Sequence, residues 1–122
     1  MQDRPVKRPA FVVAGGETTV TVRGDGMGGR NLEFALGAIR AIDQLVNTCL
    51  ITFATDGGDG PTDAAGAVVT GSSLQRALSF GFTPEAFLER NDSYHFFERL
   101  DDLIKTGPTL TNVNDLNFGF IW

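Results

Sequence analysis

The stretch that decides the predicted fold class is TTVTVRGDGMGGRN, residues 18–31. Its first part, residues 18–23, alternates β-branched side chains and predicts a strand. A glycine-rich turn follows, and an apolar-periodic run that predicts a helix begins near Arg30 or Asn31. The apolar run 50–54 comes next. A strand, a crossover helix and a second strand predict an α/β domain with a largely parallel sheet.

The turn itself has the composition of an anion-binding loop. Gly24, Gly26 and Gly29 fit the spacing G-x-G-x-x-G, and glycine lets the backbone approach a ligand closely. The N–H groups of the first helical turn would then face an anion. Arg30 adds a permanent, planar positive charge that suits phosphate or carboxylate. The alternative interpretation is a tight turn that requires only small residues.

Composition limits the class of protein. The 122 residues suit one domain, with a polar arm or linker over 1–9 and a single domain over 10–122. The net charge of −5 and a pI near 4.6 give no electrostatic footprint for nucleic acid. The sequence shows no membrane span and no signal peptide. The single cysteine, Cys49, predicts a reducing cytoplasm and an inert buried thiol.

The remaining elements follow from periodicity and turn residues. The first helix is expected to extend to about Val46 on an unusually broad apolar stripe. Gly15 and Gly16 predict either a hairpin or a kinked continuation between strand 10–13 and strand 18–23. Further strands are expected at 64–69, 103–104 and 116–122. Helices are expected from Ser72 or Ser73 to Gly81, from 84 to about 91, and over 93–100.

The tripeptide Gly-Pro-Thr occurs twice, at 60–62 and at 107–109, soon after an apolar strand each time. In open α/β sheets, ligands bind outside the carboxyl ends of parallel strands. If the strands are parallel, Arg30, the acidic loop 55–63 and the hydroxyl-rich loop 106–112 share one site. The alternative is that two loops contain the same common turn residues by coincidence.

The acidic loop supports more than one chemistry. Asp56 and Asp59 could hold Mg²⁺ near phosphate oxygens, or either could act as a general base toward a substrate hydroxyl. In the structural alternative, Asp56 caps its own loop and Asp63 is a helix N-cap. His95 is expected to pack or to lie at the surface. Residues 112–115 are expected to form a structural turn, with ligand contact as the minority interpretation.

Four motifs resemble the MOFRL domain, the C-terminal part of class II glycerate kinases that are also named hydroxypyruvate reductases. They occupy residues 15–22, 26–33, 55–66 and 106–115, in the order of that family. The resemblance implies a three-layer α/β/α domain with a mixed, largely parallel sheet. It also implies ATP-dependent phosphorylation of D-glycerate to 2-phosphoglycerate with Mg²⁺, in a cleft between two domains.

Candidate site residues come both from the resemblance, which suggests a role for Arg30, and from the loop chemistry considered for the acidic and glycine-rich loops. Arg30 matches the arginine with which this domain serves the active site, and Asp56 is the second candidate catalytic residue, with Asp56 and Asp59 as the candidate Mg²⁺ ligands. The candidate ligand- or phosphate-binding residues are Gly15, Gly16, Glu17, Gly26, Gly28, Gly29, Asn31, Thr106, Thr109, Thr111 and Asn112.

Three functions remain open at this point. The first is that of a domain that contributes half of an interdomain glycerate kinase active site. The family's N-terminal kinase domain, with its catalytic lysine, is not in this sequence, so the chain alone is expected to be inactive and to expose an apolar surface for a partner or a homodimer. The second function is an NAD(P)H-dependent reductase domain. It is disfavoured because Asp56 follows Gly29 by 27 positions, whereas a ribose-binding acid is expected at about 20. The third is a non-catalytic module that binds a phosphorylated metabolite or a partner protein.

Overall fold

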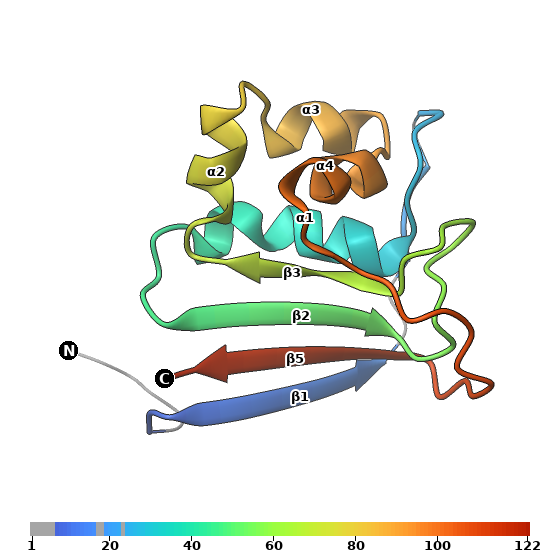
Figure 1. Cartoon of the computed structure of the whole chain (residues 1–122), viewed down its shortest axis with the longest axis horizontal. Helices are drawn as coiled ribbons and strands as arrows, with labels where there is room; N and C mark the ends of the chain where they lie inside the picture. Colours follow the sequence, from blue (N-terminus) through green and yellow to red (C-terminus); the bar gives the residue numbers. More distant parts are fainter. Residues whose placement is uncertain (1–6, 17–18, 23) are drawn as a thin grey trace.

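The computed structural model describes residues 7–16, 19–22 and 24–122, and within these ranges five strands form one sheet beside four helices (Figure 1). The sheet order is β1-β5-β2-β3-β4. The strands are β1 (Ala10–Gly16), β2 (Thr48–Ala54), β3 (Gly66–Thr70), β4 (Leu103–Ile104) and β5 (Asp115–Ile121). The helices are α1 (Arg30–Ile42), α2 (Ser73–Ser79), α3 (Pro84–Glu89) and α4 (Ser93–Leu100).

Every pair of neighbouring strands is antiparallel, so the predicted mixed, largely parallel sheet is wrong. The strand before α1 is β1, and residues 19–22 of the predicted strand 18–23 belong to no strand. β1 and β2 do run in the same direction, because both pair antiparallel with β5. The predicted strand–helix–strand order is therefore present as β1, α1 and β2, but β5, the last strand of the chain, lies between β1 and β2 in the sheet.

The four helices share one core on one face of the sheet, so the predicted three-layer α/β/α arrangement is also wrong for the described residues. Leu32, Leu36 and Ile39 of α1 pack with Val69 of β3 and with side chains from α2, α3 and α4. Phe96 of α4 makes edge-to-face contacts with neighbouring phenylalanines in this core. Burial of these side chains is what fixes the helices on this face.

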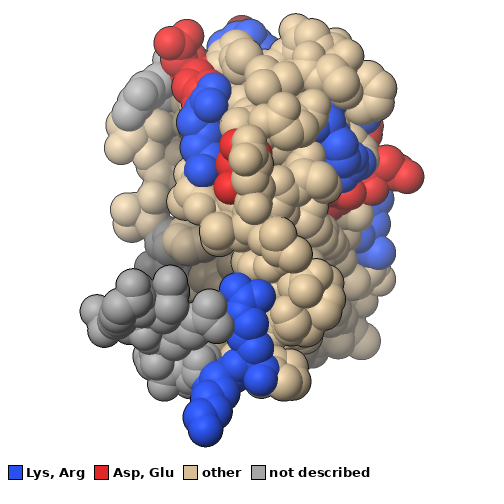
Figure 2. Space-filling view, turned by 90° about the vertical axis from the view of Figure 1, so that its left-hand side faces the viewer, with Lys and Arg blue, Asp and Glu red and all other residues tan. Residues whose placement is uncertain are grey.

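Helix α1 is shorter than the sequence predicted, and its buried apolar stripe is narrower. It ends at Ile42, and Gln44 then adopts a left-handed φ of 64°. Val46, at the predicted end of the apolar stripe, is exposed, as are Phe34 and Leu45, which were expected to widen it. Figure 2 shows the end of the molecule at which β2 begins and β5 ends, and its surface is mostly uncharged. The exposed side chains of Val46 and Trp122 belong to this end.

The opposite face of the sheet is apolar at β1 and β5. Leu50 packs toward the helical core and pairs with Gly119, so Phe118 and Phe120 point to the other face. Phe11 pairs with Phe120, stacks on both of these rings and is 57% exposed. We call Phe11, Phe118 and Phe120 the aromatic face of the sheet.

Several shorter predictions are confirmed. The helix over 93–100 and the strand over 103–104 have the predicted bounds, and Thr83 caps α3 with Pro84 at its first position.

No helix among the described residues is long and apolar enough to cross a membrane. Cys49 is half-buried and free, and burial raises the pKa of its thiol. Arg8, in the predicted arm, donates to the carbonyl of Trp122 at 3.2 Å.

Candidate functional site

The predicted loops meet at one end of the sheet, although for a different reason from the one expected. In an antiparallel sheet, the carboxyl end of one strand lies beside the amino end of the next. Asp115, the first residue of β5, pairs with Gly16 at the end of β1 and with Ala54 at the end of β2. The first turn of α1 lies at this same end, on the right of Figure 1.

Arg30 forms a fork-shaped pair with Asp115. Its Nε donates to Oδ2 at 2.6 Å, and its Nη2 lies 3.4 Å from Oδ1. The Asp115 side chain is 4% exposed, whereas that of Arg30 is 39% exposed. The carboxylate is therefore sealed into the end of the sheet, while the guanidinium can be approached from solvent. The sequence predicted a structural turn at Asp115 and did not indicate this contact.

Asp59 occupies the amino end of α1. Its Oδ2 accepts from the Leu32 backbone N–H at 2.7 Å, and its Oδ1 accepts from the Asn31 backbone N–H at 3.0 Å. The Asn31 side-chain amide also donates to Asp59 at 3.1 Å and to Asp115 at 3.0 Å. Burial raises the pKa of Asp59, although these N–H groups favour its ionised form. A carboxylate of the chain itself thus fills the position predicted for a bound anion.

The glycine turn packs against the connection between α3 and α4. The backbone N–H of Gly26 donates to the carbonyl of Arg90 at 2.8 Å, and that of Gly24 donates to the Asn91 side chain at 3.0 Å. A Cβ on Gly26 would lie 2.5 Å from the Arg90 carbonyl, and one on Gly28 would lie 2.3 Å from Ser93 Oγ. These glycines permit close packing between segments, in keeping with the interpretation of a tight turn that requires only small residues.

Gly29 is crowded by Asp59 in the same way, since a Cβ there would lie 2.5 Å from its carboxyl carbon. The amides of Gly26 and Asn31, which the prediction assigns to a ligand's phosphate, donate to protein acceptors in this structure, as does that of Leu32. Gly15 and Gly16 lie in β1, opposite Leu116 and Asp115. The candidate Glu17 lies outside the described residues.

Asp56 lies in an exposed loop, where its Oδ1 accepts from the Gly58 backbone N–H at 3.1 Å. This contact is the loop-capping role proposed as its structural alternative. The carbonyl of Asp56 accepts from the Thr109 backbone N–H at 3.3 Å. The two Gly-Pro-Thr loops consequently line one hollow of about 370 Å³, together with Asp63.

The hydroxyl-rich loop is held mainly by its own contacts. Thr109 Oγ1 donates to the Thr55 carbonyl, and Thr106 Oγ1 donates to the Gly107 carbonyl at 2.9 Å. The carbonyl of Thr111 lies 3.3 Å from Thr109 Oγ1, and Asn112 Oδ1 accepts from the Asn114 backbone N–H at 3.0 Å. These contacts give the loop the structural role that was expected for residues 112–115.

Asp63 and His95 make contacts that the sequence did not predict. Asp63 accepts from the hydroxyl of Tyr94 at 2.7 Å and lies 3.4 Å from Lys105 Nζ. Its pKa is lowered, first by Tyr94 and then by Lys105. The prediction of a helix N-cap at Asp63 is wrong, because it precedes β3 rather than a helix. His95 is partly exposed and pairs with Asp92 at 2.6 Å.

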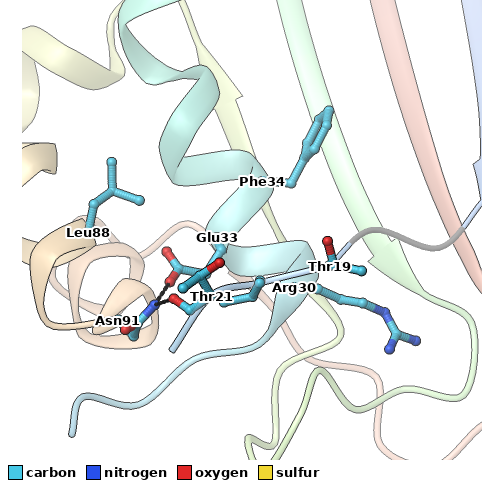
Figure 3. A pocket seen from close by; sticks show the side chains of 8 residues that line it. Thr19, Thr21, Arg30, Glu33, Phe34, Leu88 and Asn91 are labelled. Carbon is cyan, nitrogen blue, oxygen red and sulfur yellow. Dashed lines mark hydrogen bonds between the residues drawn. The ribbon is translucent and has the colours of Figure 1, made fainter. Parts of the chain in front are cut away.

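A second hollow, of about 350 Å³, lies beside Arg30 (Figure 3). Asn91 lies at one side, where its side-chain amide donates to the Thr21 carbonyl at 3.2 Å and to a carboxylate oxygen of Glu33. In Figure 3 the guanidinium of Arg30 points away from the group of Glu33 and Asn91. The sequence alone does not indicate that Glu33 and Asn91 meet, because their proximity depends on the packing of α3 against α1.

The geometry fits magnesium only in part. Within the described ranges there is no group of three or more His, Cys, Asp or Glu side chains that could hold a metal ion. Both oxygens of Asp59 accept hydrogen bonds from α1, so this residue does not fit the role of metal ligand. Asp56 is exposed and could provide one carboxylate, and Mg²⁺ bound with a nucleotide commonly takes only one or two from protein.

The candidate site therefore lies at one end of the sheet of an α/β domain, where Arg30 is held by a buried carboxylate and lines one open hollow. The two Gly-Pro-Thr loops line a separate hollow. Residues 10–115 match the model of the MOFRL family, and the chain belongs to this family.

Relatives agree with this assignment. The chain is 48% identical to a D-glycerate 2-kinase of Thermotoga maritima over 98% of its own length and 29% of the relative. It is 45% identical to a glycerate 2-kinase of Pyrococcus horikoshii, over 93% of this chain and 26% of the relative. An Agrobacterium vitis protein with a provisional hydroxypyruvate reductase name is 46% identical over 92% of this chain and 30% of its own.

The fold is that of solved glycerate kinase. A crystal structure of glycerate kinase from Thermotoga maritima superposes with a TM-score of 0.95, over 98% of this chain and 29% of the other. A Pyrococcus horikoshii structure gives a TM-score of 0.91 at 43% identity, over 97% and 27%. The chain thus spans less than a third of the length of the proteins that it matches.

Proposed function

We propose that this domain contributes one side of an interdomain active site for ATP-dependent phosphorylation of D-glycerate to 2-phosphoglycerate. The observation that carries the proposal is the exposed guanidinium of Arg30, held on the buried carboxylate of Asp115 beside an open hollow. The sequence similarity to D-glycerate 2-kinase over 98% of the chain supports it. The remaining part of such an enzyme, with ATP and the catalytic lysine, would face this end of the sheet.

Phosphoryl transfer depends mainly on positioning and on charge, with little covalent chemistry for the protein to perform. In this proposal Arg30 binds the carboxylate of glycerate or the oxygens of the transferred phosphoryl group, for which a planar two-pronged donor is suited. When bound with ATP, Mg²⁺ would neutralise phosphate charge, and Asp56 is the residue of this chain that could contact it. Asp59 instead fixes the amino end of α1.

The alternative of a reductase domain has less support. Dinucleotide binding uses a glycine turn within a parallel strand–helix–strand unit. Here the strands adjacent in the sheet are antiparallel, and the turn packs against the connection between α3 and α4. We therefore favour the kinase over the reductase, and a cytoplasmic location in keeping with the free Cys49.

The partner in this proposal is the remainder of a kinase chain, and the aromatic face of the sheet offers a second contact surface. By itself, the domain is expected to show no glycerate-dependent ATP turnover, since in this proposal it supplies only part of the groups that position the substrates. The exposed Phe11 would allow two copies of the isolated domain to associate.

The test is a kinetic comparison in the Thermotoga maritima D-glycerate 2-kinase, with this chain in place of the region that it matches. Arg30→Lys should lower kcat about 10²- to 10³-fold, because lysine does not reproduce the two-pronged contact. Arg40→Lys is the matched control, since Arg40 lies on the same helix and pairs with the exposed Glu85 away from the site. Wild-type kinetics for Arg30→Lys would overturn the assignment.

A further inference from the structure

We propose that Asp115 is a positioning residue that sets the orientation of the Arg30 guanidinium; this inference rests on the proposed function. Two features distinguish Asp115 from an ordinary ion-pair partner. Its backbone is fixed on both sides, by Gly16 in β1 and by Ala54 in β2. Its carboxylate is 4% exposed and contacts Arg30 through both oxygens.

Asp115 affects the orientation of the Arg30 guanidinium and does not strengthen its positive charge. A carboxylate beside an arginine cancels part of the positive charge that would attract an anionic substrate. It also holds the planar fork in one orientation, because the Nε edge is bound to Oδ2 at 2.6 Å. The side chain is still 39% exposed, so this contact fixes the orientation in which it meets solvent.

Asn31 connects this contact to the helix. Its side-chain amide donates both to Asp115 Oδ1 at 3.0 Å and to Asp59 Oδ1 at 3.1 Å. Asp59 in turn accepts from the backbone N–H groups of Asn31 and Leu32. The start of α1, and hence the Cα of Arg30, is therefore held by Asp59, while the tip of the Arg30 side chain is held by Asp115.

A second arginine–carboxylate pair, which joins α1 to α3, supplies the control. Arg40 and Glu85 also form a two-pronged contact, at 2.5 and 2.8 Å, but both side chains are about half exposed. An exposed pair of this kind contributes little, because solvent screens it and either side chain can adopt other rotamers. Glu85→Gln should therefore change neither turnover nor the structure around Arg30.

The first arm of the experiment uses the 122-residue chain itself and does not depend on any activity. The Arg30 Nε–H NMR signal should exchange slowly with water in the wild type and rapidly in Asp115→Asn, with Glu85→Gln resembling the wild type. Asp115→Glu, which keeps the charge, is the second variant if Asp115→Asn does not fold. Slow exchange at Arg30 in a folded Asp115→Asn chain would overturn the proposal.

The second arm measures kinetics in the hybrid kinase described above. Asp115→Asn should lower kcat by about 10²-fold, the loss associated with a misplacement near 1 Å, with a smaller effect on KM. Arg30→Lys should have little further effect in the Asp115→Asn background, since residues that act as one unit are non-additive. Additive losses would overturn the positioning role. An impaired Arg30→Lys enzyme beside a fully active Asp115→Asn enzyme would also overturn it, whereas an active Arg30→Lys enzyme would instead refute the proposed function.

Discussion

Asp59 lies 27 positions after Leu32 in the sequence, yet its carboxylate accepts the Leu32 backbone N–H at 2.7 Å. The residue therefore performs the role of a helix N-cap from a distant loop, where Gly29, the local N-cap residue, has no side chain to do so. This contact joins the acidic loop to α1, and it makes Asp59 a structural residue of the candidate site.

We expect Asp59→Ala to lower the free energy of unfolding by about 1–3 kcal/mol, because the amides of Asn31 and Leu32 would lose a buried charged acceptor. Urea unfolding followed by circular dichroism measures this. Asp25→Ala, at an exposed position of the glycine turn, is the control and should change little. Equal stability of the two variants would contradict the capping role.

The glycine turn predicts a contrast between two alanine substitutions. Gly26→Ala should destabilise the domain by about 1–3 kcal/mol, because its Cβ would lie 2.5 Å from the Arg90 carbonyl. Gly37→Ala, within α1 and with no atom within 4 Å of the added Cβ, should stabilise it by about 0.5–1 kcal/mol. Thermal unfolding of both variants checks the sign of each change. A neutral Gly26→Ala would show that the turn does not require close packing.

Asp92 predicts an acid-dependent loss of stability. Burial raises its pKa, but the Met27 backbone N–H, His95 and Arg90 together outweigh this, and the pKa lies below the usual 3.8. A carboxyl group whose pKa is depressed by folding stabilises the domain above its unfolded pKa. This contribution is lost as the pH falls below 3.8 and through the folded value.

Asp92→Asn should therefore be less stable than the wild type near neutral pH, and the difference should narrow below about pH 4. Urea unfolding of both proteins across this pH range gives the comparison. A difference that stays constant, or that widens in acid, would show that the Asp92 carboxylate does not stabilise the fold.

The aromatic face of the sheet predicts self-association of the isolated chain. Phe11→Ser should shift the chain toward monomer in sedimentation experiments, because it removes an exposed ring that stacks on Phe118 and Phe120. Phe80→Ser is the matched control, since Phe80 is comparably exposed but lies after α2, away from this face. A monomeric wild-type chain, or an equal effect of both variants, would contradict the prediction.

The sequence by itself determined the local elements. Periodicity located α1 to within a few residues of its end, and Thr83 with Pro84 marked the start of α3, because capping and amphipathicity depend on neighbours in the chain. The motifs led to the MOFRL family, which the family model confirmed over residues 10–115. They also singled out Arg30, whose role remains a proposal.

Only the tertiary structure decided the strand order and the partners of the site residues. β5 enters the sheet between β1 and β2, and no local signal can specify that insertion, since it depends on which long-range pairing buries the most surface. The same pairing brings Asp115 to Arg30 across 85 positions of sequence. Similarly, the turn glycines were visible in the sequence, but the α3–α4 connection that fills the space beside them was not. Spacing in the chain reports local geometry, whereas contacts between distant residues follow from how the whole chain packs.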